Sequence, residues 1–209
     1  MNAEIPSFLL DGPTRAKHTI ALAHGAGAAM DTPFMNNIAE ELAERGHRVA
    51  RFEFPYMARR RTTGRKSPPD RGPVLENAWR TVITHLGSKG LIIGGKSMGG
   101  RIASMVADHA QVAGLVCLGY PFHPVGKPDQ LRIAHLQTIR TPTLICQGTR
   151  DTFGTRQQVS EYPLAKAIEF CWLEDGDHSF KPRKSSGRTL DENLQQSVLA
   201  IHEFISRFA

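Results

Sequence analysis

The feature that most constrains the fold is a glycine-rich turn between a strand-like run and a helix-like run. The segment GGKSMGG at positions 94–100 follows the apolar run Leu91–Ile93 and opens a segment of helical period. A turn of this kind reverses the chain so sharply that the residues two before and two after its central serine lie where strand and helix backbones nearly touch. A Cβ atom would clash there, and the sequence supplies Gly95 and Gly99. The pattern predicts a strand–turn–helix unit with Ser97 at its tip.

Apolar runs alternate with segments of helical period along the rest of the chain. The apolar runs predict strands buried on both faces: His18–Ala23, His47–Phe54, Gly90–Ile93, Val112–Leu118, Thr143–Gln147 and Ile168–Leu173. The helical segments are Phe34–Arg45, Val74–Leu86, Met98–His109 and Leu190–Phe208. This alternation predicts a single α/β domain over residues 1–209, with a mostly parallel sheet of about six to seven strands and helices on both faces. We expect Ser7–Leu10 to add an antiparallel edge strand.

Composition narrows the class of protein. Hydrophobic residues make up 40% of the chain and charged residues 22%, which is typical of a globular domain. No apolar run approaches the roughly 20 residues that would span a membrane. The start, Met1–Pro6, lacks the basic residues of a secretion signal. The three cysteines lie in apolar runs without a CxxC pair or metal-ligand spacing, so we expect a cytoplasmic protein without metal or cofactor: Cys117, Cys146 and Cys171.

The acid and base that would activate Ser97 should follow later strands, in the order serine, acid, histidine. Asp151 lies four residues beyond the expected strand Thr143–Gln147, and His178 lies just past Ile168–Leu173. In such a triad the histidine takes the serine proton and the carboxylate orients the imidazole. Two other carboxylates remain open as the acid, although both lie within three residues of the histidine: Asp175 and Asp177.

A nucleophilic serine also needs backbone donors for the negative charge that develops on the substrate oxygen. One is expected to be the N–H of Met98, the residue after the serine. The other should come from the small-residue loop His24–Ala28 that follows the first apolar run. Ala26 is the preferred donor, with Gly25 and Gly27 as alternatives. A plain tight turn is the other interpretation of this loop.

Several ordered segments together resemble the α/β-hydrolase superfamily: HGAGAAMDTPFM at 24–35, RFEFPYM at 51–57, GKSMGGR at 95–101, GYPFHPVGKP at 119–128, QGTRDTFG at 147–154 and DGDHSF at 175–180. The chain looks like small bacterial hydrolases distantly related to dienelactone hydrolase, and like the hydrolase-like domain of a subunit of the non-specific-lethal chromatin complex. The resemblance implies the α/β-hydrolase fold and a Ser97–Asp151–His178 triad. Dienelactone hydrolase uses a cysteine where this chain has Ser97, so its substrate is not carried over.

The segment between the strands that end near Gly119 and begin near Thr143 is about 23 residues long and rich in proline. It is too short for a large helical cap over the site, which favours an open or shallow site for a small or flexible substrate. Besides Gly25, three residues of this segment are expected to line the site: Tyr120, Phe122 and His123.

The net charge of +6 is concentrated in one place. Six basic residues and one acidic residue lie between Tyr56 and Gly72, which gives this stretch a charge of +5. We expect Met57–Pro73 to be an irregular basic stretch, either a solvated mobile loop or a loop that recognises an anionic substrate. In the second case, neutralising Arg59, Arg60 and Arg61 should weaken the use of anionic over neutral esters. The loop has no aromatic residue for base stacking, so no nucleic-acid partner is expected.

These observations predict a serine hydrolase, of the carboxylesterase or thioesterase kind, that cleaves a small ester or thioester through an acyl-enzyme. The alternative is a non-catalytic binding or scaffold protein of the same fold. A nucleotide-binding module is disfavoured because the glycines at 94–100 lack the G-x-G-x-x-G steps. No membrane partner is expected. The oligomeric state and the role of Lys96 stay open.

Overall fold

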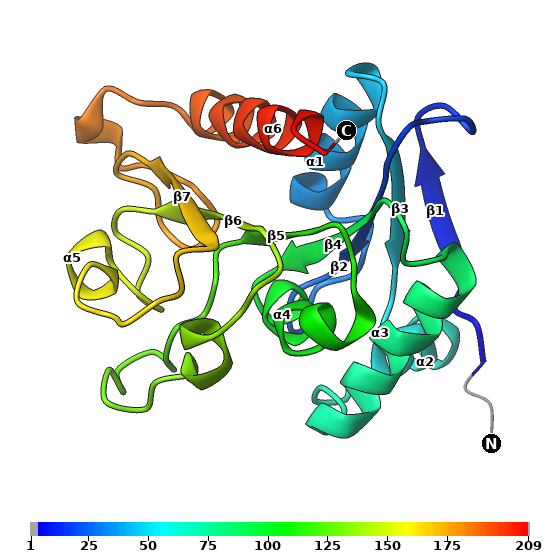
Figure 1. Cartoon of the computed structure of the whole chain (residues 1–209). Coiled ribbons are helices and arrows are strands. Elements are labelled where there is room, and N and C mark those ends of the chain that lie inside the picture. Colours follow the sequence, from blue (N-terminus) through cyan, green and yellow to red (C-terminus); the bar gives the residue numbers. More distant parts are fainter. Residues whose placement is uncertain (1–3, 209) are drawn as a thin grey trace.

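A seven-stranded sheet runs through the middle of the molecule (Figure 1). The computed structural model describes residues 4–208, so residues 1–3 and 209 of the expected domain lie outside it. The strands are β1 (Phe8–Asp11), β2 (Thr19–Ala23), β3 (Arg48–Phe52), β4 (Leu91–Lys96), β5 (Gly114–Leu118), β6 (Thr143–Gly148) and β7 (Ile168–Leu173). Their order is β1-β3-β2-β4-β5-β6-β7. All neighbours pair in parallel except β1, which is antiparallel to β3 as expected for Ser7–Leu10.

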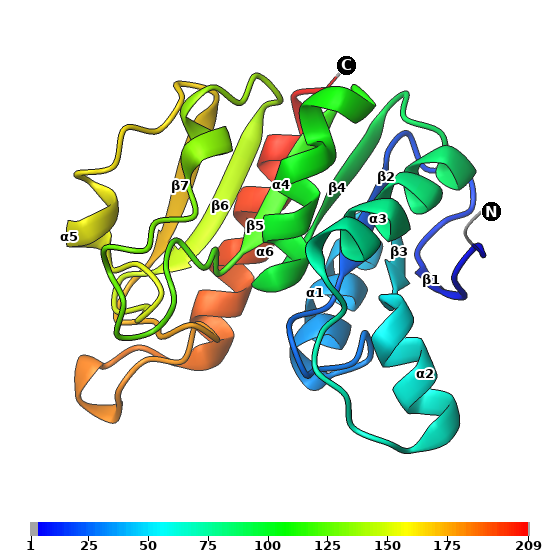
Figure 2. The same cartoon turned by 90° about the horizontal axis from the view of Figure 1, so that it is seen from below.

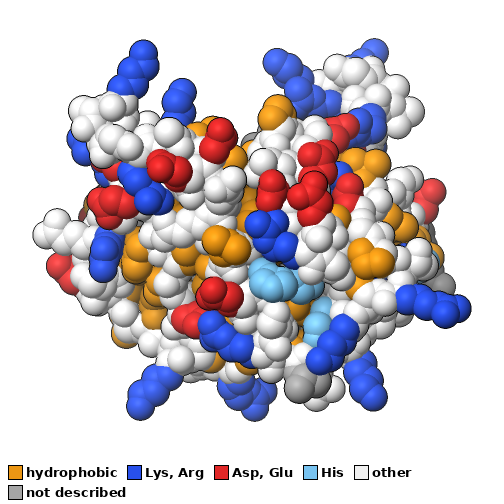
Figure 3. All heavy atoms as spheres, turned by 90° about the horizontal axis from the view of Figure 1, so that it is seen from above, with side chains coloured by type: hydrophobic (Ala, Val, Ile, Leu, Met, Phe, Trp, Pro, Cys, Tyr) orange, Lys and Arg blue, Asp and Glu red, His pale blue; other side chains and the backbone are white. Residues whose placement is uncertain are grey.

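Helices cover both faces of this sheet, so the α/β fold expected from the sequence is confirmed. One face packs against α1 (Pro33–Glu44) and α6 (Leu190–Ser206). The other packs against α2 (Pro55–Thr63), α3 (Gly72–Leu86) and α4 (Met98–Ala110) (Figure 2). Acidic and basic side chains are interspersed over the side of α1 and α6 (Figure 3). No helix among residues 4–208 is long and apolar enough to cross a membrane.

Local signals in the sequence set the helix boundaries. The Thr189 side chain accepts a hydrogen bond from the Glu192 N–H, and the Glu192 carboxylate accepts one from the Thr189 N–H at 2.7 Å. This capping box satisfies two backbone donors at the start of α6. Helix α1 begins with Pro33 after Thr32, whose side chain accepts from the Met35 N–H. These caps fix the residue at which α1 and α6 begin.

The basic segment is only partly irregular, which corrects the expectation for Met57–Pro73. Helix α2 begins with Pro55 at its first turn and ends at Gly64, whose φ of 70° suits a glycine. Only Tyr56 and Met57 of this helix are buried. Because only two residues of α2 are buried, its sequence shows no repeating apolar pattern of helical period. The only sequence signals for this helix are Pro55 at its start and Gly64 at its end.

The connection between β5 and β6 is short, as expected. Residues 119–142 contain one single-turn 3₁₀ helix, η1 (Ala134–Gln137), and no longer helix. The carboxyl edge of the sheet therefore carries no large cap in the described part of the chain.

Close backbone contacts surround the turn between β4 and α4. A Cβ on Gly99 would meet the carbonyl oxygen of Ala23 and lie 2.7 Å from that of His24. A Cβ on Gly95, whose φ is 150°, would lie 2.9 Å from the Ala23 nitrogen. Real Cβ atoms do not approach backbone this closely, so β2, β4 and α4 meet here only because both residues are glycine. The steric expectation for this turn is confirmed.

Gly99→Ala should therefore destabilise the protein. Because the added methyl group meets rigid backbone atoms of β2, the free energy of unfolding should fall by about 2 kcal/mol or more. Gly72→Ala is the matched control, since its Cβ would approach nothing closer than 3.9 Å. The measurement is the urea midpoint of each variant. Equal midpoints for the two variants would contradict this account.

Candidate active site

Ser97 sits alone in the sharp turn between the end of β4 and the first residue of α4. Its backbone has φ 52° and ψ −114°, a conformation that non-glycine residues rarely adopt. The Ser97 N–H donates to the Leu118 carbonyl at 2.9 Å, and its own carbonyl accepts from the Arg101 N–H at 3.0 Å. These bonds from β5 and α4 hold the strained residue in place.

The hydroxyl of Ser97 begins a chain of hydrogen bonds that ends on a buried carboxylate. Its Oγ lies 2.8 Å from His178 Nε2, and His178 Nδ1 lies 2.8 Å from Asp151 Oδ2. The Asp151 side chain is fully buried, whereas 23% of the His178 side chain is exposed. Because Asp151 accepts from Nδ1–H, the neutral ring has Nε2 free to accept the serine proton. The structure brings together all three residues expected from the sequence.

Asp151 is itself held by two further donors. Its Oδ2 accepts from Gln147 Nε2 at 2.9 Å, and its Oδ1 accepts from the Phe153 N–H at 2.9 Å. Gln147 is buried at the end of β6 and also bonds the backbone of Tyr120 and Gly154. Sequence reasoning missed this residue. The available signal was a polar side chain in an otherwise apolar strand, four residues before the acid.

The two rival carboxylates are committed elsewhere. Asp175 accepts from the Arg183 N–H at 2.7 Å and pairs with Arg150 at 2.9 Å. The hydrogen bonds from Arg183 lower the pKa of Asp175 to about 2. Asp177 Oδ1 accepts from the backbone of Ser179 and Lys181. Both residues shape the loop that carries the histidine, and Asp151 is the carboxylate bonded to its ring.

Lys96 connects the strand before the serine to the loop of the histidine. Its Nζ donates to the His178 carbonyl at 2.6 Å and lies 5.6 Å from the centre of the Phe34 ring. Burial lowers the pKa of this ammonium to about 8. A buried ammonium keeps its one strong acceptor close, so Lys96 anchors the backbone of His178. The sequence alone gave no role for this lysine because its partner lies 82 positions away.

The loop His24–Ala28 lies against the same turn. The Cβ position of Gly25 is 3.7 Å from the Cβ of Ser97. The Ala28 N–H donates to the Gly25 carbonyl, and Gly27 has the positive φ of 75° that such a turn needs. The Gly27 N–H donates to the Tyr56 hydroxyl at 3.2 Å. Gly25 and Gly27 are the alternatives to Ala26 as the loop N–H donor. The Gly27 N–H already has an acceptor in the Tyr56 hydroxyl.

His24 fixes the orientation of this loop. Its Nδ1 bonds the Gly25 carbonyl at 2.7 Å, and its Nε2 accepts from the Phe54 N–H at 3.1 Å. Burial lowers the pKa of His24, which keeps the ring neutral and matches one donor with one acceptor. The Ala26 N–H has no acceptor among the described residues. Met98 opens α4, where the first N–H groups lack helical partners.

The expected lining residues after β5 are in the interior, which corrects that part of the site. The side chains of Tyr120 and Phe122 have no exposed surface, and His123 is 2% exposed. The rings of Tyr120 and Phe122 pack together with centres 4.8 Å apart. The short β5–β6 connection packs this aromatic pair into the core, so its rings do not form a substrate surface.

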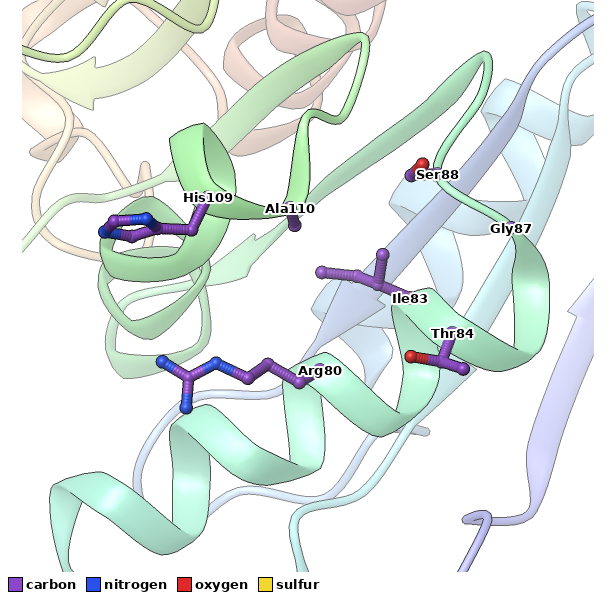
Figure 4. Close-up of a pocket in the computed structure, with 7 residues that line it drawn as sticks. All are labelled: Arg80, Ile83, Thr84, Gly87, Ser88, His109 and Ala110. Carbon is purple, nitrogen blue, oxygen red and sulfur yellow. The ribbon is translucent and has the colours of Figure 1, made fainter.

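The described surface also has a hollow at the other end of α4. Arg80, Ile83, Thr84, Gly87, Ser88, His109 and Ala110 line it (Figure 4). They come from the last two turns of α3, the residues just after it and the end of α4, away from the turn that begins α4. Within residues 4–208 no group of three or more His, Cys, Asp or Glu side chains is placed to hold a metal ion.

The sheet order, the strand–turn–helix unit and the serine–histidine–carboxylate array together define an α/β-hydrolase fold. The sequence profile described as the alpha/beta hydrolase domain matches residues 16–206, and the chain belongs to that family. The family relation inferred from its motifs is thereby confirmed, while the likeness to the chromatin-complex subunit stays a prediction.

Solved structures of low sequence identity share the fold. An alpha-beta serine hydrolase homologue from Coxiella burnetii is 21% identical, with a TM-score of 0.66 over 96% of this chain and 89% of that one. A serine hydrolase without lid from Xanthomonas campestris is 20% identical, with a TM-score of 0.65 over 93% and 88%. Dienelactone hydrolase from Anabaena variabilis is 18% identical, with a TM-score of 0.70 over 96% and 91%.

Lys96→Met should slow the reaction of Ser97 with a fluorophosphonate probe. Without its anchor the His178 loop shifts, and the rate constant for labelling should fall about tenfold or more because the base loses alignment. Labelling is followed by mass spectrometry. Lys89→Met, at an exposed position, is the control. An unchanged labelling rate in Lys96→Met would show that the lysine does not position His178.

Proposed function

We propose that this protein is a serine hydrolase that cleaves a small ester or thioester through an acyl-enzyme intermediate. The single observation that carries the proposal is the unbroken hydrogen-bond chain from Ser97 Oγ through His178 to Asp151. Each member lies just beyond the carboxyl end of a strand, where this fold carries its chemistry. The backbone strain at Ser97 supports the proposal, since such strain gathers at functional residues.

In the proposed mechanism Ser97 Oγ attacks the substrate carbonyl while His178 Nε2 takes its proton. The negative charge on the carbonyl oxygen is stabilised by the N–H groups of Met98 and Ala26. His178 then gives the proton to the leaving group, and the acyl group stays on Ser97. A water molecule, deprotonated by His178, releases the acid and restores the serine. Asp151 stays ionised and stabilises the imidazolium in both halves.

The surroundings of the triad support a small or extended substrate. No large cap covers the carboxyl edge in the described chain, so nothing there forms a closed tunnel for a long acyl chain. Because Tyr120 and Phe122 are buried in the core, Gly25, beside Ser97, is the remaining residue that we expect to contact the substrate. A cytoplasmic location stays a prediction from the three free cysteines.

The decisive experiment compares wild type with Ser97→Ala. We expect a fluorophosphonate to label Ser97, and short p-nitrophenyl esters to be cleaved. Ser97→Ala should reduce kcat at least about 1,000-fold, because loss of the nucleophile removes the covalent pathway. Thermal unfolding of both proteins controls for folding. Absence of the adduct in folded wild type would favour the non-catalytic binding or scaffold alternative. Turnover unaffected by the substitution would exclude Ser97 as the nucleophile.

A further inference from the structure

Arg101, whose N–H donates to the Ser97 carbonyl, and Arg132 differ from the other arginines that are partly or fully buried. Every other such arginine gives its guanidinium a carboxylate, amide or carbonyl acceptor: Arg45, Arg48, Arg51, Arg60, Arg150 and Arg188. Arg101 and Arg132 are also half-buried, and their guanidinium groups have no hydrogen-bond acceptor and no carboxylate within 4.0 Å among residues 4–208. One of these nitrogens, Arg101 Nε, is fully buried, and a buried charged donor without an acceptor is unfavourable unless an anion completes it.

Arg101 carries the stronger signal. Its Nε is buried and has no hydrogen-bond partner in the described part of the chain. It lies on the first turn of α4, four residues after Ser97, which is about 6 Å along the helix axis. Asp108, the acidic residue of α4, does not pair with the Arg101 guanidinium. Its carboxylate accepts instead from Thr141 and from the Arg140 N–H.

Arg132 comes from the β5–β6 connection and lies close to Arg101. Burial and the charge of Arg101 both lower the pKa of Arg132. Burial and the same charge also lower the pKa of His135. The Arg101 and Arg132 side chains therefore lie close enough for their charges to interact, although the two residues are 31 positions apart in the sequence. No carboxylate among residues 4–208 forms an ion pair with either of them.

A network of neutral side chains holds the two arginine backbones in this arrangement. Ser104 Oγ donates to the Arg101 carbonyl at 2.6 Å and lies 2.8 Å from His135 Nε2. The Tyr120 hydroxyl donates to the Arg132 carbonyl at 3.2 Å and lies 3.4 Å from the same His135 nitrogen. The network links α4 to the connection across the arginine pair. The pair is thus preorganised by contacts that leave both guanidinium groups available.

The arginines expected to bind an anion are engaged elsewhere. Arg59 pairs with Asp70 at 2.6 Å, and Arg61 pairs with Glu53 at 2.6 Å and with Asp31 at 2.9 Å. Arg60 donates to the Gly27 carbonyl at 3.1 Å. Arg59 and Arg61 thus have carboxylate partners among residues 4–208, whereas Arg101 and Arg132 do not.

We propose that Arg101 and Arg132 bind a carboxylate or phosphate group of the substrate, so that the ester is anionic. Guanidinium groups match the oxygens of both anions. The assignment to substrate rests on the proposed function. The anion site itself rests on the unpaired guanidinium groups and can be tested without turnover.

The binding arm of the test titrates folded protein with succinate and with inorganic phosphate by calorimetry. Wild type should bind at least one of them, and comparison of the two identifies carboxylate or phosphate as the preferred group. Arg101→Met and Arg132→Met should each raise Kd about tenfold or more, because each removes a charged donor. Arg132→Lys keeps the charge and should retain part of the binding. Arg15→Met, at an exposed position, is the matched control.

The kinetic arm compares mono-p-nitrophenyl glutarate with p-nitrophenyl pentanoate, which differ mainly in the terminal carboxylate. The ratio of their kcat/KM values should fall about tenfold in Arg132→Met and stay unchanged in Arg15→Met. No binding of either anion by wild type, or binding that both methionine variants retain, would overturn the anion site. Binding that is lost without a change in the ratio would overturn the assignment to substrate. If neither ester is cleaved and Ser97 is not labelled, the proposed function fails, and the titration alone decides the anion site.

Discussion

The structure depends on one close approach, in which the backbones of β2, β4 and α4 meet at two glycines. Gly95 and Gly99 face the Ala23 backbone at distances that leave no room for a Cβ atom. The contact forces the strained conformation of Ser97, and it also brings the loop after Ala23 to the side of the serine. One steric condition therefore sets both the exposed hydroxyl and the nearby backbone N–H groups of His24–Ala28.

The other half of the site depends on the ends of β6 and β7. A Cβ on Gly148 would meet the carbonyl of Gly176, so the turns that carry Asp151 and His178 are packed together. Lys96 then ties the His178 carbonyl to the strand that ends at Ser97. The three side chains are aligned by backbone contacts and by one buried ammonium. Such preorganisation is what general base chemistry requires.

Features with a local cause could be predicted from the sequence. The turn at 94–100 follows from short-range sterics, and the strand runs follow from their apolar pattern. Asp151 and His178 are found from the chain order serine, acid, histidine that this fold uses after its later strands. Other features depend on distant partners. Helix α2 buries only two residues and leaves no period, and the aromatic residues after β5 become core because the connection is short. The partner of Lys96 and the contact of Gln147 with Tyr120 are set by the fold, because they join residues 82 and 27 positions apart.

The arginines show most clearly the difference between features that the sequence predicts locally and features set by distant partners. A sequence counts arginines but does not tell which ones meet a carboxylate. In the densest basic stretch, Arg61 makes a structural ion pair with Glu53. The same Glu53 carboxylate accepts a hydrogen bond from the Met30 N–H at 3.3 Å. Arg60 and Tyr56 bond the two sides of Gly27, so α2 supports the loop beside Ser97. Among the half-buried arginines of residues 4–208, Arg101 and Arg132 are the two whose guanidinium groups have no acceptor, and Arg101 lies on the first turn of α4, four residues after Ser97.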